Sequence, residues 1–130
     1  MILMDTDICV ELLRGNQRVI ERRRNVAGEI AVAFMTVGEL FYGADRSTQP
    51  ARNHELVERF LLSVTCIHSN RHIMERFGNL KAHLATRGET LPDADILIAA
   101  TTLTHADAVV SGNQAHFARF PGLTVLDWTR

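Results

Sequence analysis

The sequence predicts an α/β fold of three layers, with a central parallel sheet of four to five strands between two layers of helices. Short apolar runs alternate along the chain with amphipathic segments, which is the order that strands and helices take in such folds. Acidic or polar residues directly follow several of the apolar runs, at the positions where parallel sheets build their sites. The 130 residues suit a single domain, 1–130, and contain no repeat or linker.

The N-terminal part predicts two strands and two helices. Residues 2–4 form an apolar run that predicts a buried strand, and the stretch 5–7 offers caps for a helix over 8–13. A second helix is predicted over 17–24, and a second buried strand over 30–34.

Two helices, a strand and a further helix are predicted next. Thr36 and Glu39 have the spacing of a capping box, so we expect a helix to be capped by Thr36. Pro50 opens a long amphipathic helix, and 64–67 is the third apolar run. The helix after this run is predicted to end at Gly88.

A helix of unusual polarity precedes the last two strands. It is predicted to start at Pro92 and Asp93, with Asp93 as its cap, and to end at about Thr104. Because it is apolar nearly all round, we expect it to be buried. The fourth and fifth strands are predicted over 108–111 and 123–126.

Composition excludes several classes of protein. The hydrophobic fraction of 46% and the charged fraction of 22% exclude a disordered chain or a coiled coil. No apolar run approaches the roughly 18 residues of a membrane span, and the N-terminus does not resemble a signal peptide. Because the 2 cysteines also make no disulfide framework, we expect a cytoplasmic protein.

Charge alone does not indicate a nucleic-acid binder, since the formal net charge is −1. A cluster of carboxylates can nevertheless offset a basic face elsewhere. Arg14, Arg18 and Arg22 recur at every fourth position. Their favoured interpretation is a solvated face, and contact with an RNA backbone is the second.

Acidic residues stand where a parallel sheet predicts a site. Asp5 directly follows the first strand, and because three caps are available there for one helix, we expect Asp5 to be free for function. Asp95 lies in the first turn of the buried helix, where an unpaired carboxylate is costly. Glu39 is either the capping-box residue or a third acid. Asn113 follows the fourth strand, where a simple polar turn is the alternative.

Carboxylates that gather at one point repel each other, so they either shift their pKa values or recruit a cation. Hard oxygen ligands without Cys or His favour Mg²⁺ or Mn²⁺. The reaction that suits such an ion is phosphodiester hydrolysis, in which the metal activates a water and neutralises charge on the phosphate. We expect no zinc site, because neither a CxxC nor an HExxH pattern is present.

Four segments together resemble the PIN-domain ribonucleases, and specifically the VapC-type toxins of bacterial toxin–antitoxin pairs. They are similar to that family's opening LDTN-type motif, its ELxYGA-like helix, its RG…DxxIAA segment and its VTxN…F…IPGL…W tail. In this chain they are Met4–Cys9, Thr36–Ala44, Arg87–Ala100 and Val110–Trp128. They occur in the family's order, at suitable spacing and nearly from end to end.

The resemblance implies a PIN-like fold and a set of site residues. Asp5 and Asp95 would be the principal metal ligands, with Glu39 as the third acid and ligand. The hydroxyl of Thr6 would assist them.

The chain departs from the family near the fourth strand, where many relatives carry a further acid. Asn113 occupies that region, and His116 stands where other members have an acidic residue. Asp93 is an additional acid that we expect to compensate in a supporting role.

The resemblance also implies partners. These are an RNA substrate, either transfer RNA or ribosomal RNA, and a cognate VapB-type antitoxin that wraps the toxin and presents a basic residue to the acidic pocket. A homodimer is implied as well, and no membrane.

Two other functions remain open from the residues. Asp5, Thr6 and Asp7 also fit the opening motif of phosphatases with an aspartyl nucleophile, although Lys81 is predicted to lie on the surface rather than near a phosphate. A PIN fold without its fourth acid would alternatively serve as an inert module that binds RNA or protein.

Overall fold

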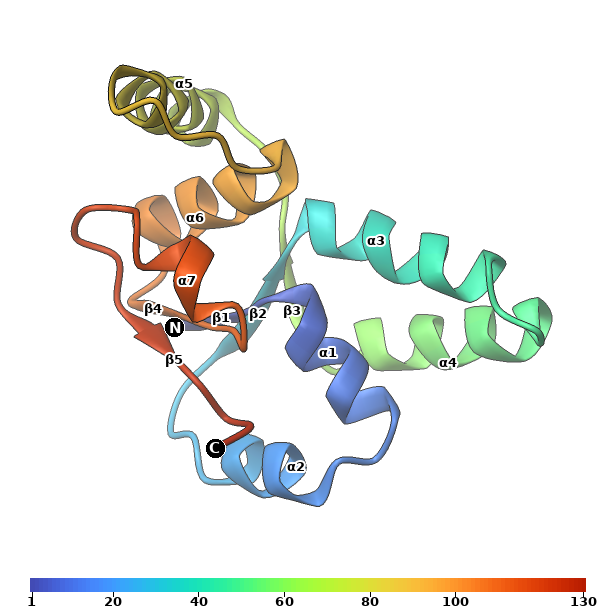
Figure 1. Ribbon diagram of the computed structural model, residues 1–130. Helices are drawn as coiled ribbons and strands as arrows, with labels where there is room; N and C mark the ends of the chain where they lie inside the picture. The colour runs from blue at the N-terminus through green and yellow to red at the C-terminus, as the bar shows by residue number, and fades with distance from the viewer.

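The computed structural model describes residues 1–130 and contains a five-stranded parallel sheet with the order β3-β2-β1-β4-β5 (Figure 1). This confirms the predicted fold class. The strands are β1 (Ile2–Met4), β2 (Ile30–Ala33), β3 (Thr65–Ile67), β4 (Ala108–Val110) and β5 (Val125–Leu126). The helices are α1 (Thr6–Leu13), α2 (Gln17–Arg24), α3 (Phe34–Asp45), α4 (Pro50–Leu61), α5 (Arg71–Thr86), α6 (Asp93–His105) and α7 (Gln114–Phe117).

The two faces of the sheet bury separate hydrophobic cores. Alternate residues of a strand point to opposite faces, so Leu3 packs with α5, α6 and α7, whereas Met4 packs with α1, α2, α3 and α4. Val109 and Val110 divide between the two cores in the same way. Apart from the exposed Thr65 at the start of β3, the strand residues are apolar on both faces of the sheet, which explains why the strands are continuous apolar runs.

Helix α6 is buried on all sides, as its composition predicts. The seven residues Ile96–Thr102 are all buried. Two of them are polar, and their hydroxyl groups are satisfied within the helix, because Thr101 donates to the carbonyl of Leu97 and Thr102 to that of Ile98. Asp95 lies in the first turn of this helix, directly before the buried residues that hold the helix in the core.

The strand order reverses between β1 and β4. The chain builds β1, β2 and β3 outward in one direction, and then returns to place β4 on the other side of β1. In open parallel sheets, sites form at the carboxyl ends of the strands that flank such a reversal. The residues that follow β1 and β4, which are Asp5 and Ser111, occupy this position.

The caps of three helices differ from the predictions. Asp5 itself is the N-cap of α1, although we expected it to be free of that task. Helix α3 begins before Thr36, since its N-cap is Ala33, so Thr36 lies inside the helix. Asp93 is the first residue of α6 and not its cap, because the preceding Pro92 takes that position without a side-chain bond.

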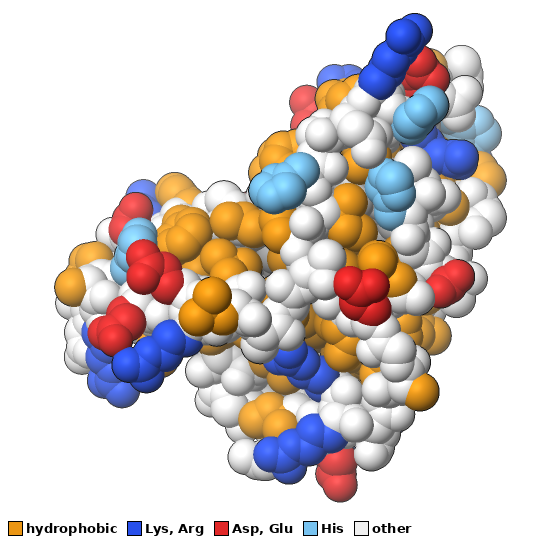
Figure 2. Space-filling model, turned by 180° about the vertical axis from the view of Figure 1, so that it is seen from behind, with side chains coloured by type: hydrophobic (Ala, Val, Ile, Leu, Met, Phe, Trp, Pro, Cys, Tyr) orange, Lys and Arg blue, Asp and Glu red, His pale blue; other side chains and the backbone are white.

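The short helix α7 was not predicted, because four residues are too few to show a helical period. None of the helices combines the length and the apolar character needed to cross a membrane. Figure 2 shows the face turned away in Figure 1, where basic and acidic side chains are intermixed rather than gathered by sign.

Candidate active site

Asp5 is a buried carboxylate with a double role. One of its oxygens, Oδ1, accepts the N–H of Thr6 at 2.8 Å and so caps α1, and the other, Oδ2, accepts the hydroxyl of Ser111 at 2.8 Å. Only 7% of the residue is exposed. A cap bond uses one carboxylate oxygen and one lone pair, so capping and a place in the site are compatible.

The electrostatics of the site centre on Asp5. Burial, together with the negative charge of Asp7, raises the pKa of Asp5 to about 7. The hydrogen bonds from Ser111 and Thr6 oppose this shift, while the charge of Asp95 adds to it. These carboxylates therefore lie in one another's field, in a setting that favours a proton or a cation.

Glu39 reaches the site through Thr6. The hydroxyl of Thr6 donates to Glu39 Oε1 at 2.7 Å and lies 3.0 Å from the hydroxyl of the buried Thr36. Because Thr6 has one hydrogen to give, Thr36 donates to Thr6 in turn. The capping-box interpretation of Glu39 is therefore wrong, and the glutamate joins α3 to the start of α1.

Asp95 comes from the first turn of α6 and pairs with a histidine. Its Oδ2 lies 2.6 Å from Nδ1 of His116, and the side chain of Asn113 lies 2.8 Å from the same nitrogen. Asp93 does not join them, because it is exposed and forms an ion pair with Lys81 at 3.0 Å.

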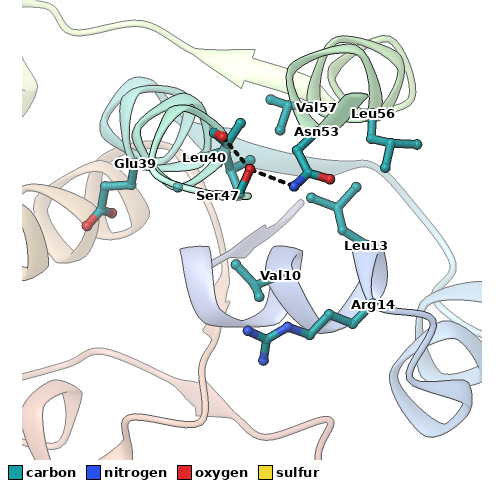
Figure 3. Close-up of a pocket in the computed structure, with 11 residues that line it drawn as sticks. Val10, Leu13, Arg14, Glu39, Leu40, Ser47, Asn53, Leu56 and Val57 are labelled. Atoms are coloured by element: carbon teal, nitrogen blue, oxygen red, sulfur yellow. Dashed lines mark hydrogen bonds between the residues drawn. The ribbon is translucent and has the colours of Figure 1, made fainter. Parts of the chain in front are cut away.

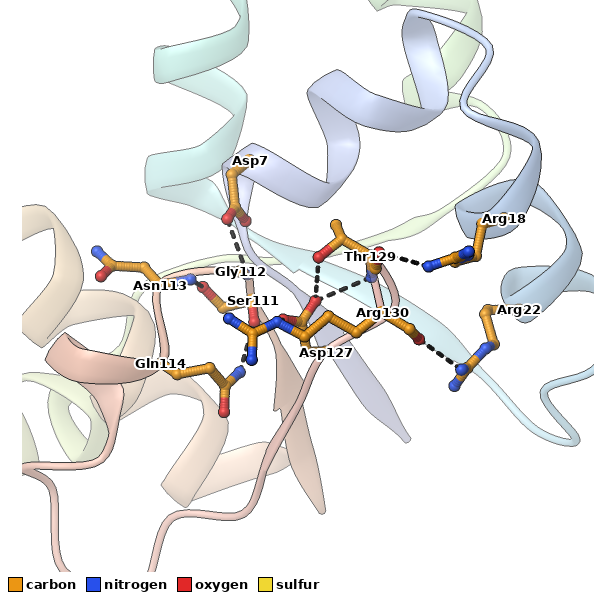
Figure 4. Close-up of polar contacts among 10 residues, drawn as sticks. All are labelled: Asp7, Arg18, Arg22, Ser111, Gly112, Asn113, Gln114, Asp127, Thr129 and Arg130. Carbon is orange, nitrogen blue, oxygen red and sulfur yellow. Dashed lines mark hydrogen bonds and ion pairs between the residues drawn. The ribbon is translucent and has the colours of Figure 1, made fainter.

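Asp7, one of the three candidate caps of the first helix, is a further acid of the site. Its Oδ2 accepts the N–H of Gly112 at 2.8 Å, so it joins α1 to the loop after β4 (Figure 4). Burial raises the pKa of Asp7. A Cβ atom added to Gly112 would lie 2.9 Å from this oxygen, so a larger residue there would displace the carboxylate of Asp7. A glycine directly after a polar strand end was the only signal for this contact in the sequence.

The three arginines Arg14, Arg18 and Arg22 are all exposed, as their favoured interpretation expects, and two of them also contact the C-terminal residues. Arg18 donates to the carbonyl of Thr129 at 3.2 Å, and Arg22 donates to that of Arg130 at 2.6 Å, so both hold the C-terminal residues (Figure 4). Arg14 instead lies 3.9 Å from Glu11, and its side chain is 74% exposed.

A groove lies beside the acids, between α1, α3 and α4. It encloses about 350 Å³, and Figure 3 shows its lining side chains. Glu39 and Arg14 supply its charged groups. The remaining lining is mainly apolar and includes Val10, Leu13, Leu40, Leu56 and Val57.

The donor atoms suit a hard divalent cation better than a soft one. The site offers carboxylate, hydroxyl and amide oxygens, and its nearest thiol, Cys9, is fully buried. As the side chains stand, no three His, Cys, Asp or Glu residues meet closely enough to enclose an ion. Asp5 and Glu39 are linked through Thr6, whereas Asp95 is held separately by His116.

Comparison with known proteins gives consistent results. The family model described as PIN domain matches residues 2–123. Ribonuclease VapC2 of Haemophilus influenzae is 32% identical over 97% of this chain and 96% of its own. The tRNA(fMet)-specific endonuclease VapC of Shigella flexneri is 27% identical over 98% of this chain and 97% of its own.

Solved structures agree with these relatives. The DNA-bound VapBC of Salmonella typhimurium matches with a TM-score of 0.91 and 27% identity, over 98% of this chain and 97% of that one. VapBC2 of Rickettsia felis, bound to a DNA fragment from its promoter, matches with a TM-score of 0.91 and 26% identity, over 98% and 99% of the two chains. This chain therefore belongs to the PIN-domain family, among the VapC ribonucleases.

Proposed function

We propose that the protein is the toxin of a toxin–antitoxin pair, a Mg²⁺-dependent endoribonuclease that cleaves structured RNA in the cytoplasm, with Mn²⁺ as a substitute ion. The observation that carries this proposal is the buried carboxylate of Asp5, whose pKa rises to about 7 because it lies in a buried place among other acids. Such a site gains stability from a divalent cation. The two relatives named as tRNA(fMet)-specific endonucleases make transfer RNA the first substrate to test.

Asp5, Asp95 and Glu39 would hold the ion. A bound divalent ion lowers the pKa of water and neutralises charge that develops on a phosphate. Thr6 orients Glu39 by its hydrogen bond, and Asn113 lies beside the histidine that contacts Asp95. We assign no role in catalysis to Asp93, because Lys81 already neutralises it at the surface.

We propose an antitoxin of the VapB type as the partner that occupies the groove between α1, α3 and α4. The solved relatives are VapBC complexes, which supports this choice. An apolar lining with Glu39 at the edge suits a peptide that places apolar side chains in the groove and a basic one near the acids. We also propose that the protein forms a homodimer.

The test of the proposed function is RNA cleavage by the purified, antitoxin-free protein. Total bacterial RNA is incubated with Mg²⁺, with Mn²⁺ or with EDTA, and new ends are mapped. We expect discrete cuts that EDTA abolishes and that Asp95→Asn reduces at least about 100-fold, because a ligand and its charge are lost. Asp107→Asn is the control, since Asp107 is an exposed acid that pairs with the N-terminal amine.

The outcomes separate the competing functions. Cleavage that persists in Asp95→Asn indicates a contaminating nuclease or a different site. A folded protein that binds Mn²⁺ without cutting RNA indicates the inert binding module. A covalent phosphate on Asp5 indicates the phosphatase.

A further inference from the structure

Three acids of the site each hold a different residue of the segment 111–116, which follows β4. The pairs and their distances are Asp5 with Ser111 (2.8 Å), Asp7 with Gly112 (2.8 Å) and Asp95 with His116 (2.6 Å). The acids come from the starts of α1 and α6, which are remote from each other in the chain. One short segment therefore contacts acids from both helices.

Asn113 joins the two ends of this segment. Its backbone N–H donates to Ser111 Oγ at 2.9 Å, and its side-chain amide lies 2.8 Å from His116 Nδ1. With the bonds at either end, a continuous polar path runs from Asp5 to Asp95. The spacing of the two principal acids is thus tied to the conformation of one segment.

The hydrogen between Asp95 and His116 belongs on the imidazole. A ring nitrogen carries either a hydrogen or a lone pair, and a lone pair 2.6 Å from an ionised carboxylate would be repelled. Nδ1 therefore carries the hydrogen and donates it to Oδ2 of Asp95. Since such a nitrogen cannot also accept, the side-chain amide of Asn113 turns its oxygen, and not its nitrogen, toward Nδ1. The bond from His116 fixes the carboxylate and leaves its other oxygen, Oδ1, for a further ligand.

The segment is held rigidly enough to set a position. The side chain of Gln114 donates to the carbonyl of Ser111 at 2.6 Å, which closes the turn. Phe117, directly after the segment, is fully buried in the core beside α6. Gly112 is held as well, because its N–H donates to Asp7 Oδ2 at 2.8 Å. The ends and the middle of the segment are thus each anchored.

From these contacts we propose that residues 111–116 set the separation of Asp5 and Asp95, and that His116 is the positioning residue that orients Asp95 toward a divalent cation. The inference rests on the proposed function, because it concerns the same site. It assigns His116 a task that differs from that of an acid at the same place: the imidazole orients a ligand and does not add one.

The experiment measures Mn²⁺ binding to the full chain by titration calorimetry, without RNA. His116→Ala is expected to weaken Mn²⁺ binding about 10–100-fold, as the loss of a partner that orients a metal ligand usually does. His116→Asn is expected to restore most of the affinity, because its amide N–H can take the place of Nδ1–H. His116→Phe keeps a ring without the donor and is expected to fail like alanine, so a packing defect is distinguishable.

His105→Ala is the matched control. Nε2 of His105 lies 3.1 Å from the side-chain nitrogen of Asn70 at the far end of α6, and no carboxylate pairs with this histidine. The control should bind Mn²⁺ like the wild type, and the thermal melting of each variant should confirm its folding.

A second pair of variants tests the path itself. Ser111→Ala should also weaken Mn²⁺ binding, and the double variant with His116→Ala should lose less than the product of the two single effects, since both break one path. Equal or tighter Mn²⁺ binding by His116→Ala would overturn the inference and leave the proposed function intact. Absence of Mn²⁺ binding by the wild type would overturn both.

Discussion

At the scale of the residue, Asp5 couples stability to pH. Its pKa rises to about 7 in the folded chain, above the ordinary value of 3.8 that the unfolded chain has. Between these values the folded state keeps a proton that the unfolded state has lost. Stability from this group is therefore present at acid pH and falls as pH rises through the window, by up to about 1.4 kcal/mol per pH unit.

Asp5→Asn should consequently stabilise the metal-free protein at pH 8 by about 1–3 kcal/mol and leave it nearly unchanged at pH 4. Asparagine keeps the cap of α1, since its carbonyl accepts the same N–H. The measurement is urea unfolding at both pH values in EDTA. An equal gain at pH 4 and pH 8 would show that the buried charge is not the cause.

At the scale of the element, α3 contains a glycine, Gly38, at a position where neither the backbone conformation nor the packing requires one. Gly38 is exposed, its φ is negative, and a Cβ added to it meets nothing within 4 Å. Glycine inside a helix costs about 0.5–1 kcal/mol relative to alanine. Gly38→Ala should therefore raise the free energy of unfolding by about this amount, as urea titration can measure.

Gly88→Ala is the opposite control. Its backbone has a φ of +66°, which an alanine adopts only under strain, so this variant should lose stability although its added Cβ also meets open space. A loss of stability in Gly38→Ala as well would mean that α3 has a constraint other than its backbone.

The elements themselves were predictable because their signals are local. The apolar runs gave five strands close to their observed places, and the all-round apolar character of α6 predicted its burial. The caps were less predictable, since several adjacent residues had side chains suited to the task. The contacts of Glu39 with Thr6 and of Asp7 with Gly112 were not predictable at all, because they depend on how distant elements pack.

The candidate site was predictable in part for the same reason. A parallel sheet brings strand ends together, so Asp5 was proposed from its place after the first strand and Asp95 from its place at the start of a buried helix. Glu39, in contrast, was assigned to the site through the resemblance to the PIN-domain ribonucleases. Asp93 has an equally suitable place in the sequence, but residues in one turn of a helix point in different directions. The side chain of Asp93 points to the surface, where it pairs with Lys81. Periodicity does not distinguish these two aspartates of α6.

At the scale of the whole molecule, the groove proposed to bind the antitoxin adjoins the acids through Glu39. Most of its lining is apolar and lies outside the proposed metal ligands, so partner binding and chemistry can be tested separately. Leu56 lines this groove and is 37% exposed. A charge at this position would lie against apolar side chains of the partner and lose its water. Leu56→Glu should therefore weaken the binding of the VapB-type antitoxin at least about 10-fold, equivalent to about 1.4 kcal/mol, and leave RNA cleavage by the free protein unchanged.

Leu62→Glu is the matched control, because Leu62 is 88% exposed and lies outside this groove. The measurement compares antitoxin binding by calorimetry with cleavage in the absence of antitoxin. If Leu56→Glu bound the antitoxin as tightly as Leu62→Glu does, the partner would have to occupy a different surface.

The order of the strands has a consequence for synthesis on the ribosome. β1 is the first strand made, yet one of its two neighbours is β4, which is made near the end. Asp5 therefore emerges early and meets Asp95 and Ser111 only when most of the chain has been translated. A nascent or prematurely terminated polypeptide lacks an assembled site, so we expect translation to release a nuclease only on completion, when the antitoxin can capture it.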